Sequence, residues 1–529
     1  MRKILPLNLF LLKRWLLLIF LLAVLFLAGE IRIWQLGENP AGFFCDEASI
    51  GYDAYSLLTT GKDGYGKPWP IFFHAFGEYK NPIMIYSAIL PIRIWGLNEF
   101  SVRVVSAFYG VLGVIAIYFL AAKLGNPVLG LPSALFLAIS PWDIHFSRVA
   151  LEGLMPFVFF TTLATYFWVK HWRGRKRWRD FILAIFLFAL ALYSYFPARI
   201  FIPLFCIGLV FLERKGLIKN KRKLFWGIIL SSLLLLPLFF HTFWGAGFSR
   251  WNQVKPTSIS LLQLIKKYID HFSFDFLFFL GDAGFPGQFI TRHSIKRMGE
   301  LYLFQIPLLV IGFYCLFKNI RRKENKILLL WFLFYPLGSV LTQASGPQAT
   351  RSVIGVVPFQ ITSAVGLMAM VSWLKKRVSQ LNFLFKGLMG LVVLFSFINY
   401  FFKMTNYPLY SADYWGWQYG PSKIIAYFKT VDRQYDQLLM TNRFNAPQIF
   451  FKFYDSKGEC SHCRLGDINN LDSFSRQLFA VEEEAIKEWD SRGIKYDLKK
   501  VVFYPDGTSA FFIIEPFFQK LLPLGGHKR

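Results

Sequence analysis

The chain has 529 residues, of which 55% are hydrophobic and 19% aromatic, and its formal net charge is +27. This composition excludes an ordinary soluble enzyme and indicates a polytopic α-helical membrane protein. The basic residues fall in short runs between apolar segments and no nucleic-acid-binding motif accompanies them, so we expect anionic lipid headgroups, not nucleic acid, as the partners of this charge.

About eleven apolar stretches are candidate transmembrane helices, although several are shorter than the roughly 20 residues that a span needs. They cover 14–33, 101–122, 127–140, 153–170, 181–196, 198–213, 225–243, 301–317, 327–342, 353–374 and 384–402. The first stretch resembles a signal-peptide core, but no clear cleavage site follows it, so we expect an uncleaved anchor.

The connections between these stretches predict the orientation of the chain in the membrane. Every second connection is basic, which indicates a cytoplasmic N-terminus. The basic residues are Arg2, Lys3, Lys13, Arg14 and Lys123 and those within 170–179, 214–223, 318–326 and 375–377. The outer, extracytoplasmic face then receives 34–100, 141–152, 244–300, 343–352 and the C-terminal region. Within 34–100, the apolar stretch 82–95 contains prolines and an arginine and is expected to be an amphipathic helix in the interface.

Two adjacent carboxylates, Asp46 and Glu47, follow the first apolar stretch on the predicted outer face. Carboxylates at a membrane surface are costly, and chemistry on a lipid-linked substrate is one reason to keep them there. The alternative is helix capping, with Asp46 as the cap of a helix that begins at Glu47.

Cations on the same outer face are candidates for holding an anionic phosphate, which arginine can clamp with two hydrogen bonds. They are Lys80, Arg103, Arg199 and Arg351. The alternatives are a lysine that extends along the interface to water, for Lys80, and ordinary interfacial anchors, for the arginines.

Two outer segments combine polar residues with aromatic ones. The segment 140–153 contains His145, Arg148 and Glu152, where Glu152 could hold a divalent metal or orient an acceptor, or simply pair with Arg148 one helical turn away. The segment 271–302 contains Asp282 and His293 among aromatic rings, which suits sugar recognition and equally suits a re-entrant packing element.

From about residue 403 to the end, the composition becomes that of a small soluble α/β domain of roughly 125 residues. We expect strands at 437–441, 448–453, 501–504 and 509–515, and a helix at 472–493. Cys460 and Cys463 form a single Cys-x-x-Cys motif, which leaves open a metal site, a local disulfide or no special role.

Taken in order, these motifs resemble the GT-C membrane glycosyltransferases, and more closely the branch of protein O-mannosyltransferases and lipid A aminoarabinose transferases. The pair Asp46-Glu47 matches the acidic pair after the first span, and Arg103 matches the arginine that opens the second. Lys80-Asn81-Pro82-Ile83 matches a Lys-Pro-Pro-Leu-like motif with Asn in place of the first Pro, and Glu152 matches the second acidic position, where relatives often have Asp. The resemblance covers about residues 10–400.

This resemblance implies a transmembrane catalytic domain over 1–402 and an inverting transfer of a sugar from a polyprenyl phosphate to an acceptor hydroxyl, while the α/β domain over 403–529, expected on the extracytoplasmic face, is predicted from composition and is not explained by the resemblance in detail. The acceptor would be a protein, a lipid or a polysaccharide. In this interpretation Asp46, Glu47 and Glu152 are catalytic, and Lys80, Arg103, Arg199 and Arg351 hold the donor phosphate. The acceptor or the sugar would contact Tyr52, His145, Arg148, Tyr195, Asp282 and His293. A divalent cation at Glu152 is a candidate cofactor, although some relatives work without a metal.

Two other classes of function stay open from the sequence. A transporter or flippase of lipid-linked sugars would have charged residues near the middle of its spans and mirrored halves, neither of which the sequence shows. A structural or binding protein would have its soluble tail as the working part.

Overall fold

The computed structural model of the protein describes residues 7–174, 176–256, 258–288, 290–343 and 346–517. The chain divides into two compact units. The helical unit contains Met1–Gly37 and Asp53–Thr405, and the C-terminal unit contains Glu38–Tyr52 and Asn406–Arg529. The segment 38–52 therefore belongs with the C-terminal residues, although it lies near the start of the sequence. Among the basic residues that predict orientation, Arg2, Lys3 and Arg175 lie outside the described residues.

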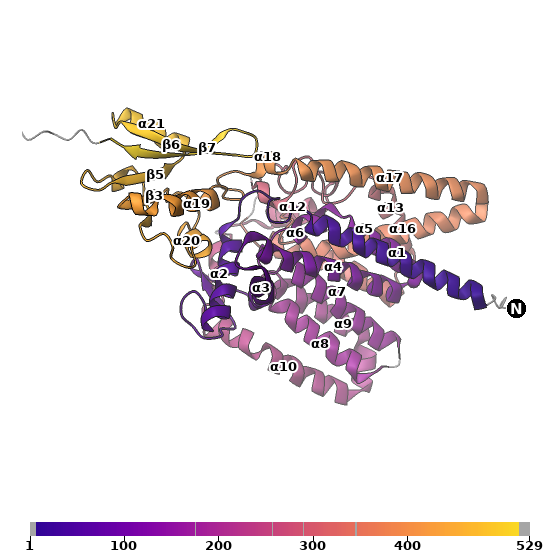
Figure 1. Ribbon diagram of the computed structural model, residues 1–529. Coiled ribbons are helices and arrows are strands. Elements are labelled where there is room, and N and C mark those ends of the chain that lie inside the picture. Colours follow the sequence, from indigo (N-terminus) through magenta and orange to yellow (C-terminus); the bar gives the residue numbers. More distant parts are fainter. Residues whose placement is uncertain (1–6, 175, 257, 289, 344–345, 518–529) are drawn as a thin grey trace, which may run out of the picture. The chain divides into compact units, whose positions relative to one another are not determined.

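The helical unit consists of long helices joined mostly by short turns (Figure 1). Its main helices are α1 (Leu7–Ile33), α4 (Glu99–Leu124), α5 (Pro127–Ala138), α7 (Leu154–Arg173), α8 (Trp178–Leu192), α9 (Ala198–Lys219), α10 (Lys221–Phe243), α13 (Gln305–Lys318), α14 (Lys323–Phe334), α16 (Val356–Arg377) and α17 (Ser379–Thr405). Shorter elements are α3 (Pro82–Trp95), α6 (Pro141–Ser147), α11 (Ser249–Val254), α12 (Leu261–Asp270), α15 (Leu337–Val340), a π-helical turn (Asp275–Phe279), two 3-10 turns (Thr291–His293 and Val353–Gly355) and the hairpin of β1 (Phe73–Ala75) and β2 (Glu78–Lys80).

Each of the eleven apolar stretches overlaps one of these main helices, although several helices begin before or end after the predicted bounds. Within the described residues, five helices are long and apolar enough to cross a membrane, or six if α5 and α6, which are bent by 59° to each other, form one span. Helices α8, α13 and α14 have 15, 14 and 12 residues, fewer than a full span needs. The helices at these positions are therefore confirmed, while a total of about eleven spans stays a prediction.

Helix α4 is central to the packing of the helical unit, because it contacts α1, α3, α5 and α7. Its start is fixed by a capping box: Asn98 Oδ1 accepts the Ser101 N–H at 2.9 Å, and Ser101 Oγ accepts the Asn98 N–H at 3.2 Å. The expected helix at 82–95 is also present, as α3, and it begins directly after the β1–β2 hairpin. That hairpin places Glu78 and Lys80 directly before α3.

The C-terminal unit is built on a five-stranded sheet in the order β4-β3-β5-β7-β6. Its strands are β3 (Gln437–Met440), β4 (Cys463–Leu465), β5 (Gln477–Val481), β6 (Tyr496–Phe503) and β7 (Ser509–Pro516). Strand β3 pairs in parallel with β4 and β5, and β7 pairs antiparallel with β5 and β6. The unit also contains α18 (Pro408–Ser411), α19 (Pro421–Val431), α20 (Gln448–Tyr454), α21 (Glu483–Ser491) and two 3-10 turns (Asp432–Gln434 and Ile468–Asn470), while α2 (Cys45–Thr60) crosses the boundary between the units.

Two expectations for the C-terminal residues are wrong. The segment 448–453 is a helix, α20, because its buried residues Ile449, Phe450 and Phe453 share one helical face. The expected helix at 472–493 contains strand β5 followed by the shorter α21. All five residues of β5 are buried in the middle of the sheet, and a short run that is buried on both faces has no alternating pattern to distinguish it from a helix. Strands at 437–441, 501–504 and 509–515 are confirmed by β3, β6 and β7.

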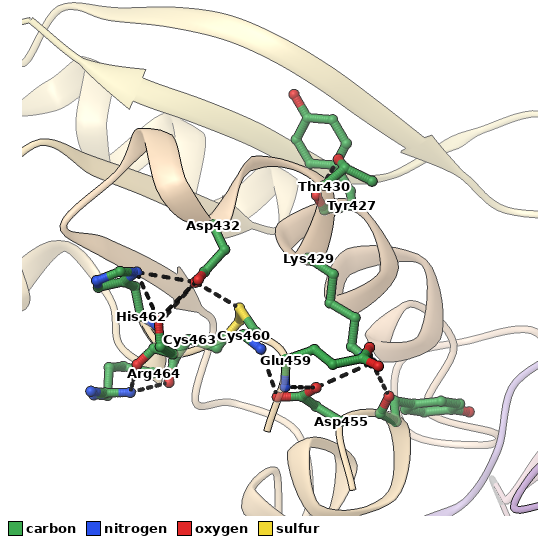
Figure 2. The surroundings of a disulfide bond; sticks show 12 residues. Tyr427, Lys429, Thr430, Asp432, Asp455, Glu459, Cys460, His462, Cys463 and Arg464 are labelled. Atoms are coloured by element: carbon green, nitrogen blue, oxygen red, sulfur yellow. Dashed lines mark hydrogen bonds and ion pairs between the residues drawn. A yellow bond between two sulfur atoms is a disulfide. The ribbon is translucent and has the colours of Figure 1, made fainter. Parts of the chain in front are cut away.

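Cys460 and Cys463 are joined in a disulfide bond, which excludes thiolate ligation of a metal in this state (Figure 2). Asp432 lies beside the disulfide and accepts the His462 N–H at 3.0 Å and the Ser461 hydroxyl at 2.9 Å. Burial opposes ionisation of Asp432, but these hydrogen bonds outweigh it and lower its pKa. The disulfide therefore closes a small loop that a carboxylate holds together.

Glu515 on β7 is the centre of an ion-pair network on the same sheet. It pairs with Arg476 and Lys499, each at 2.9 Å, and accepts the Tyr435 hydroxyl at 3.0 Å. Burial alone would raise the pKa of Glu515, but the three hydrogen bonds lower it to about 2. The carboxylate is thus strongly stabilised in its ionised form.

Candidate active site

The turn that carries Glu152 is held in an uncommon conformation. Glu152 has a φ of 48°, in the left-handed region that residues other than glycine rarely adopt. A Cβ atom on the following Gly153 would lie 2.0 Å from the backbone oxygen of Ser194. The turn between α6 and α7 is therefore pressed against the turn between α8 and α9, and the glycine permits that approach.

Arg250 on α11 joins two carboxylates from distant parts of the sequence. Its Nη1 lies 2.9 Å from Glu78 Oε2, and its Nη2 lies 3.9 Å from Glu152 Oε1. Sequence reasoning missed Arg250, although it follows α10 in a segment predicted to face outward, where a cation opposes the positive-inside trend just as Arg199 and Arg351 do. The same signal could have identified it.

A small polar cleft in the helical unit brings several predicted residues together. We call it the Glu152 cleft; it is lined by Glu152, Tyr195, Phe196, Pro197, Ile200, Arg250, Trp251, Val254, Gly338, Thr342 and Arg351. Three of the predicted site residues, Glu152, Tyr195 and Arg351, thus share one cavity. Two guanidinium groups and one carboxylate line the cleft, and a second carboxylate, Glu78, pairs with Arg250 from outside the lining.

Lys80 and Arg199 lie close to each other in the helical unit. Arg199 Nη2 donates to Asn81 Oδ1 at 2.9 Å, next to Lys80. Lys80 and Glu78 occupy the same face of β2, since residues two apart in a strand share a face. The Lys80 side chain is 3% exposed, with Nζ 4.9 Å from the centre of the Phe76 ring, so it does not extend into solvent as the interfacial alternative requires.

Asp282, His293 and His145 form a second polar group. Asp282 Oδ2 lies 3.3 Å from His293 Nδ1 and accepts the N–H of Ala349 at 2.7 Å. His145 Nε2 lies 2.8 Å from the carbonyl oxygen of Arg292, the neighbour of His293. This group is connected through Ala349 to the segment that ends at Arg351 in the Glu152 cleft. Three of the six residues predicted to contact the acceptor or the sugar are therefore brought together.

Arg103 and Arg148 lie in a different, buried cluster at the end of α1. Arg148 Nη1 donates to the carbonyl of Ile31 at 2.7 Å, and Arg103 Nη1 donates to that of Leu36 at 3.4 Å. Nearby, Arg32 pairs with Asp143 at 2.5 Å. Cations at the C-terminal end of a helix satisfy its last carbonyl groups. The phosphate and acceptor roles of Arg103 and Arg148 stay predictions.

The alternative in which Arg148 and Glu152 pair as neighbours on one helix is wrong. Helix α6 ends at Ser147 and α7 begins at Leu154, so residues 148–152 form no helical turn that would align the two side chains.

The remaining predicted residues, Asp46, Glu47 and Tyr52, belong to the C-terminal unit. Asp46 and Glu47 occupy the first turn of α2. Helix α2 begins at Cys45 and not at Glu47, so Asp46 lies inside the helix and is not the residue before it, while Glu47 Oε2 accepts the N–H of Phe44 at 3.2 Å, three residues earlier. Tyr52 stacks with the Lys452 ammonium, which lies 5.5 Å from its ring centre. Glu47 is buried and Asp46 is partly exposed.

A divalent cation at Glu152 does not fit these surroundings. Its neighbours in the cleft include Arg250 and Arg351, whose positive charges repel a metal ion. Within the described parts of the chain, three or more His, Cys, Asp or Glu side chains do not come together in a group that could hold a metal.

Residues 80–244 match a family model described as dolichyl-phosphate-mannose-protein mannosyltransferase. An uncharacterized protein of Aquifex aeolicus (strain VF5) is 28% identical over 202 residues, which are 38% of this chain and 37% of that protein. The chain thus matches well under half the length of that relative. The family match includes Lys80, Arg103, Glu152 and Arg199.

Solved structures with the same architecture come from two enzymes. The oligosaccharyltransferase of Archaeoglobus fulgidus in its apo form has a TM-score of 0.56 at 13% identity, covering 84% of this chain and 64% of that one. ArnT from Cupriavidus metallidurans in the apo state has a TM-score of 0.56 at 10% identity, covering 95% of this chain and 98% of that one. Both have the GT-C fold, so the resemblance to GT-C membrane glycosyltransferases that the sequence motifs indicated is confirmed.

Proposed function

We propose that this chain, which has the GT-C glycosyltransferase fold, is a multi-pass membrane enzyme that transfers a sugar from a polyprenyl phosphate to an acceptor hydroxyl on the extracytoplasmic face. Its N-terminus is cytoplasmic, and the outer loops carry the reacting groups. The observation that carries this proposal is the Glu152 cleft, where Arg250 and Arg351 from separate loops converge beside Glu152 and Tyr195. Fixed guanidinium groups in a sheltered cleft suit a phosphate.

The leaving group explains why several cations are needed. When the sugar leaves a polyprenyl phosphate, a phosphodiester with one negative charge becomes a monoester with two. Cations held in place before the reaction stabilise this growing charge without reorganisation. Arg250 and Arg351 in the cleft, with Lys80 and Arg199 nearby, are the residues that perform this function.

The acceptor is activated by a carboxylate. Asp46 accepts the proton of the acceptor hydroxyl as its oxygen attacks the anomeric carbon. The bond between that carbon and the phosphate oxygen breaks, and its electron pair stays on the phosphate. One displacement of this kind inverts the anomeric configuration. Glu47 holds the start of α2, while Glu152, Tyr195 and the Asp282–His293–His145 group orient the sugar and the acceptor.

The lipid donor is supported by what the structural neighbours contain. One structure of ArnT from Cupriavidus metallidurans is bound to undecaprenyl phosphate, with a TM-score of 0.54 at 11% identity. One structure of the archaeal oligosaccharyltransferase holds an inhibitory peptide and a dolichol-phosphate, with a TM-score of 0.56 at 12% identity. A lipid-linked donor also needs no nucleotide-binding motif.

The proposal is tested with a panel of labelled polyprenyl-phosphate sugars, offered to the purified protein with membrane extract as the source of acceptor. We expect at least one sugar to become covalently attached to an extract component with its anomeric configuration inverted. The Asp46→Asn variant should lose this transfer. Movement of the lipid across vesicle membranes without any new glycosidic bond would identify a flippase and overturn the proposal.

A further inference from the structure

The segment that carries the acid pair packs against the C-terminal residues through several contacts. Gly42 has a φ of 91°, and a Cβ atom there would lie 2.5 Å from the backbone oxygen of Trp417. The rings of Phe43 and Phe453 are 4.8 Å apart. These contacts, with that of Tyr52 and Lys452, explain why 38–52 forms one compact unit with 406–529.

Gln418 makes the hydrogen bond that reaches the acid-bearing helix itself. Its Oε1 accepts the N–H of Cys45, the first residue of α2, at 2.8 Å, and its Nε2 donates to the carbonyl of Asn445 at 2.9 Å. The side chain is 1% exposed. An N–H at the start of a helix has no acceptor within the helix, so the Gln418 amide oxygen supplies the hydrogen-bond acceptor that the Cys45 N–H needs. Gln418 thus links the first turn of α2 to the loop before α20.

The backbone at Gln418 indicates that the side chain is held there at a cost. Its φ is 48°, which is rare for a residue with a Cβ and which a glycine would adopt more easily. Such strain persists where surrounding contacts determine the conformation. A neutral amide also satisfies the Cys45 N–H without adding negative charge beside Asp46 and Glu47, as an Asp or Glu cap would.

We propose that Gln418 is a positioning residue through which the C-terminal unit fixes the first turn of α2 and thereby the direction of the Asp46 carboxylate. This inference rests on the proposed function of Asp46 as the general base. Gln418 touches neither substrate nor reacting atom; it acts through the backbone of Cys45. The C-terminal unit is accordingly part of the catalytic apparatus and not an appended domain.

The test compares three variants of the full-length protein. Gln418→Met keeps the volume of the side chain but removes the acceptor, whereas Gln418→Glu keeps an acceptor at the same reach. Gln477→Met is the matched control, because Gln477 is also 1% exposed and links backbone groups of the same unit, accepting from Asp472 N–H at 2.7 Å and donating to the Asn470 carbonyl at 2.8 Å.

Amide hydrogen exchange of the 38–52 segment and steady-state transfer kinetics are measured on all three. We expect Gln418→Met to exchange faster at the start of α2 and to lower kcat about 10-fold, with KM for the donor within about twofold, since misdirection of a base affects the transition state and not donor binding. Gln418→Glu should restore slow exchange and recover part of kcat. Gln477→Met should lower the unfolding temperature without either effect.

Unchanged exchange and kcat in Gln418→Met, or equal kcat losses in Gln418→Met and Gln477→Met, would overturn the inference. The Asp46→Asn variant separates this failure from failure of the proposed function. Full transfer by Asp46→Asn rejects the general base, and with it the catalytic purpose of Gln418. If Asp46→Asn is inactive while Gln418→Met is fully active, only the positioning inference fails.

Discussion

Replacing Arg250 by glutamine tests whether the Glu152 cleft holds the donor phosphate, at a residue that only the structure identifies. The Arg250 guanidinium lies 2.9 Å from Glu78 and 3.9 Å from Glu152, and its side chain is 33% exposed. A fixed donor to a developing oxyanion contributes roughly 100- to 1,000-fold to kcat in a site without water. Because Arg250 is partly exposed and its charge is shared with two carboxylates, we expect a smaller loss of about 10- to 100-fold in kcat/KM for the donor, or about 1.4–2.8 kcal/mol of activation free energy.

Arg250→Lys should lie between the wild type and Arg250→Gln, since lysine keeps the charge but cannot reach both carboxylates with a planar fork. Arg173→Gln is the matched control: Arg173 forms an ion pair of 3.0 Å with Glu324, its side chain is 41% exposed, and it lies at the end of α7 outside the cleft. Transfer of labelled sugar is measured against donor concentration, together with the unfolding temperature. We expect Arg173→Gln to retain full kcat/KM. Equal kcat/KM for Arg250→Gln and Arg173→Gln would refute the role of Arg250.

Three further predictions concern the base, the Glu152 turn and the C-terminal sheet. Asp46→Asn should lower kcat by at least about 100-fold with an unchanged unfolding temperature, as loss of a general base does; activity near that of the wild type would contradict this. Gly153→Ala should destabilise the protein by about 1–3 kcal/mol, because the new Cβ collides with the Ser194 backbone. The control Gly387→Ala, with nothing within 4 Å of its Cβ, should be neutral or stabilising. Similar unfolding temperatures for the two variants would show that Gly153 does not contact the Ser194 backbone. The pKa of Glu515, about 2, lies below its usual value of 4.5. Its ion pairs therefore stabilise the fold above about pH 4.5, and this stabilisation is lost as the pH falls through about 2. Acid unfolding followed by tryptophan fluorescence should show that stability depends less on pH in Glu515→Gln than in the wild type, and identical unfolding curves would count against the network.

The main helices of the helical unit are predictable because apolar runs dominate the sequence, and each of the eleven stretches overlaps a helix. For the shorter segments, burial in the folded chain decides between helix and strand. Segment 448–453 is rich in aromatic residues that favour strands, but burial of Ile449, Phe450 and Phe453 on one helical face decided the outcome. The sequence does not distinguish strand β5 from a helix, because a strand buried on both faces has no alternation of polar and apolar residues.

The residues of the Glu152 cleft come from segments that are far apart in the sequence. The sequence motifs therefore identify several of these residues, but they do not predict that the residues line one cavity. Glu152, Tyr195 and Arg351 were each recognised as charged or polar residues on the outer face, and the fold places them in one cavity. Arg250 carries the same signal but stands in no motif. The contact between Gln418 and Cys45 joins residues 373 positions apart, and a glutamine in a soluble segment gives no local sign of such a partner.

The most direct measurement of the central claim is the stoichiometry of the reaction. Purified protein is incubated with a polyprenyl-phosphate sugar accepted in the panel, and both the released polyprenyl phosphate and the sugar attached to the acceptor are quantified. We expect one polyprenyl phosphate to appear for each sugar transferred, with both products absent in Asp46→Asn. Attached sugar without released polyprenyl phosphate, or release of the lipid phosphate with no sugar on any acceptor, would contradict the account.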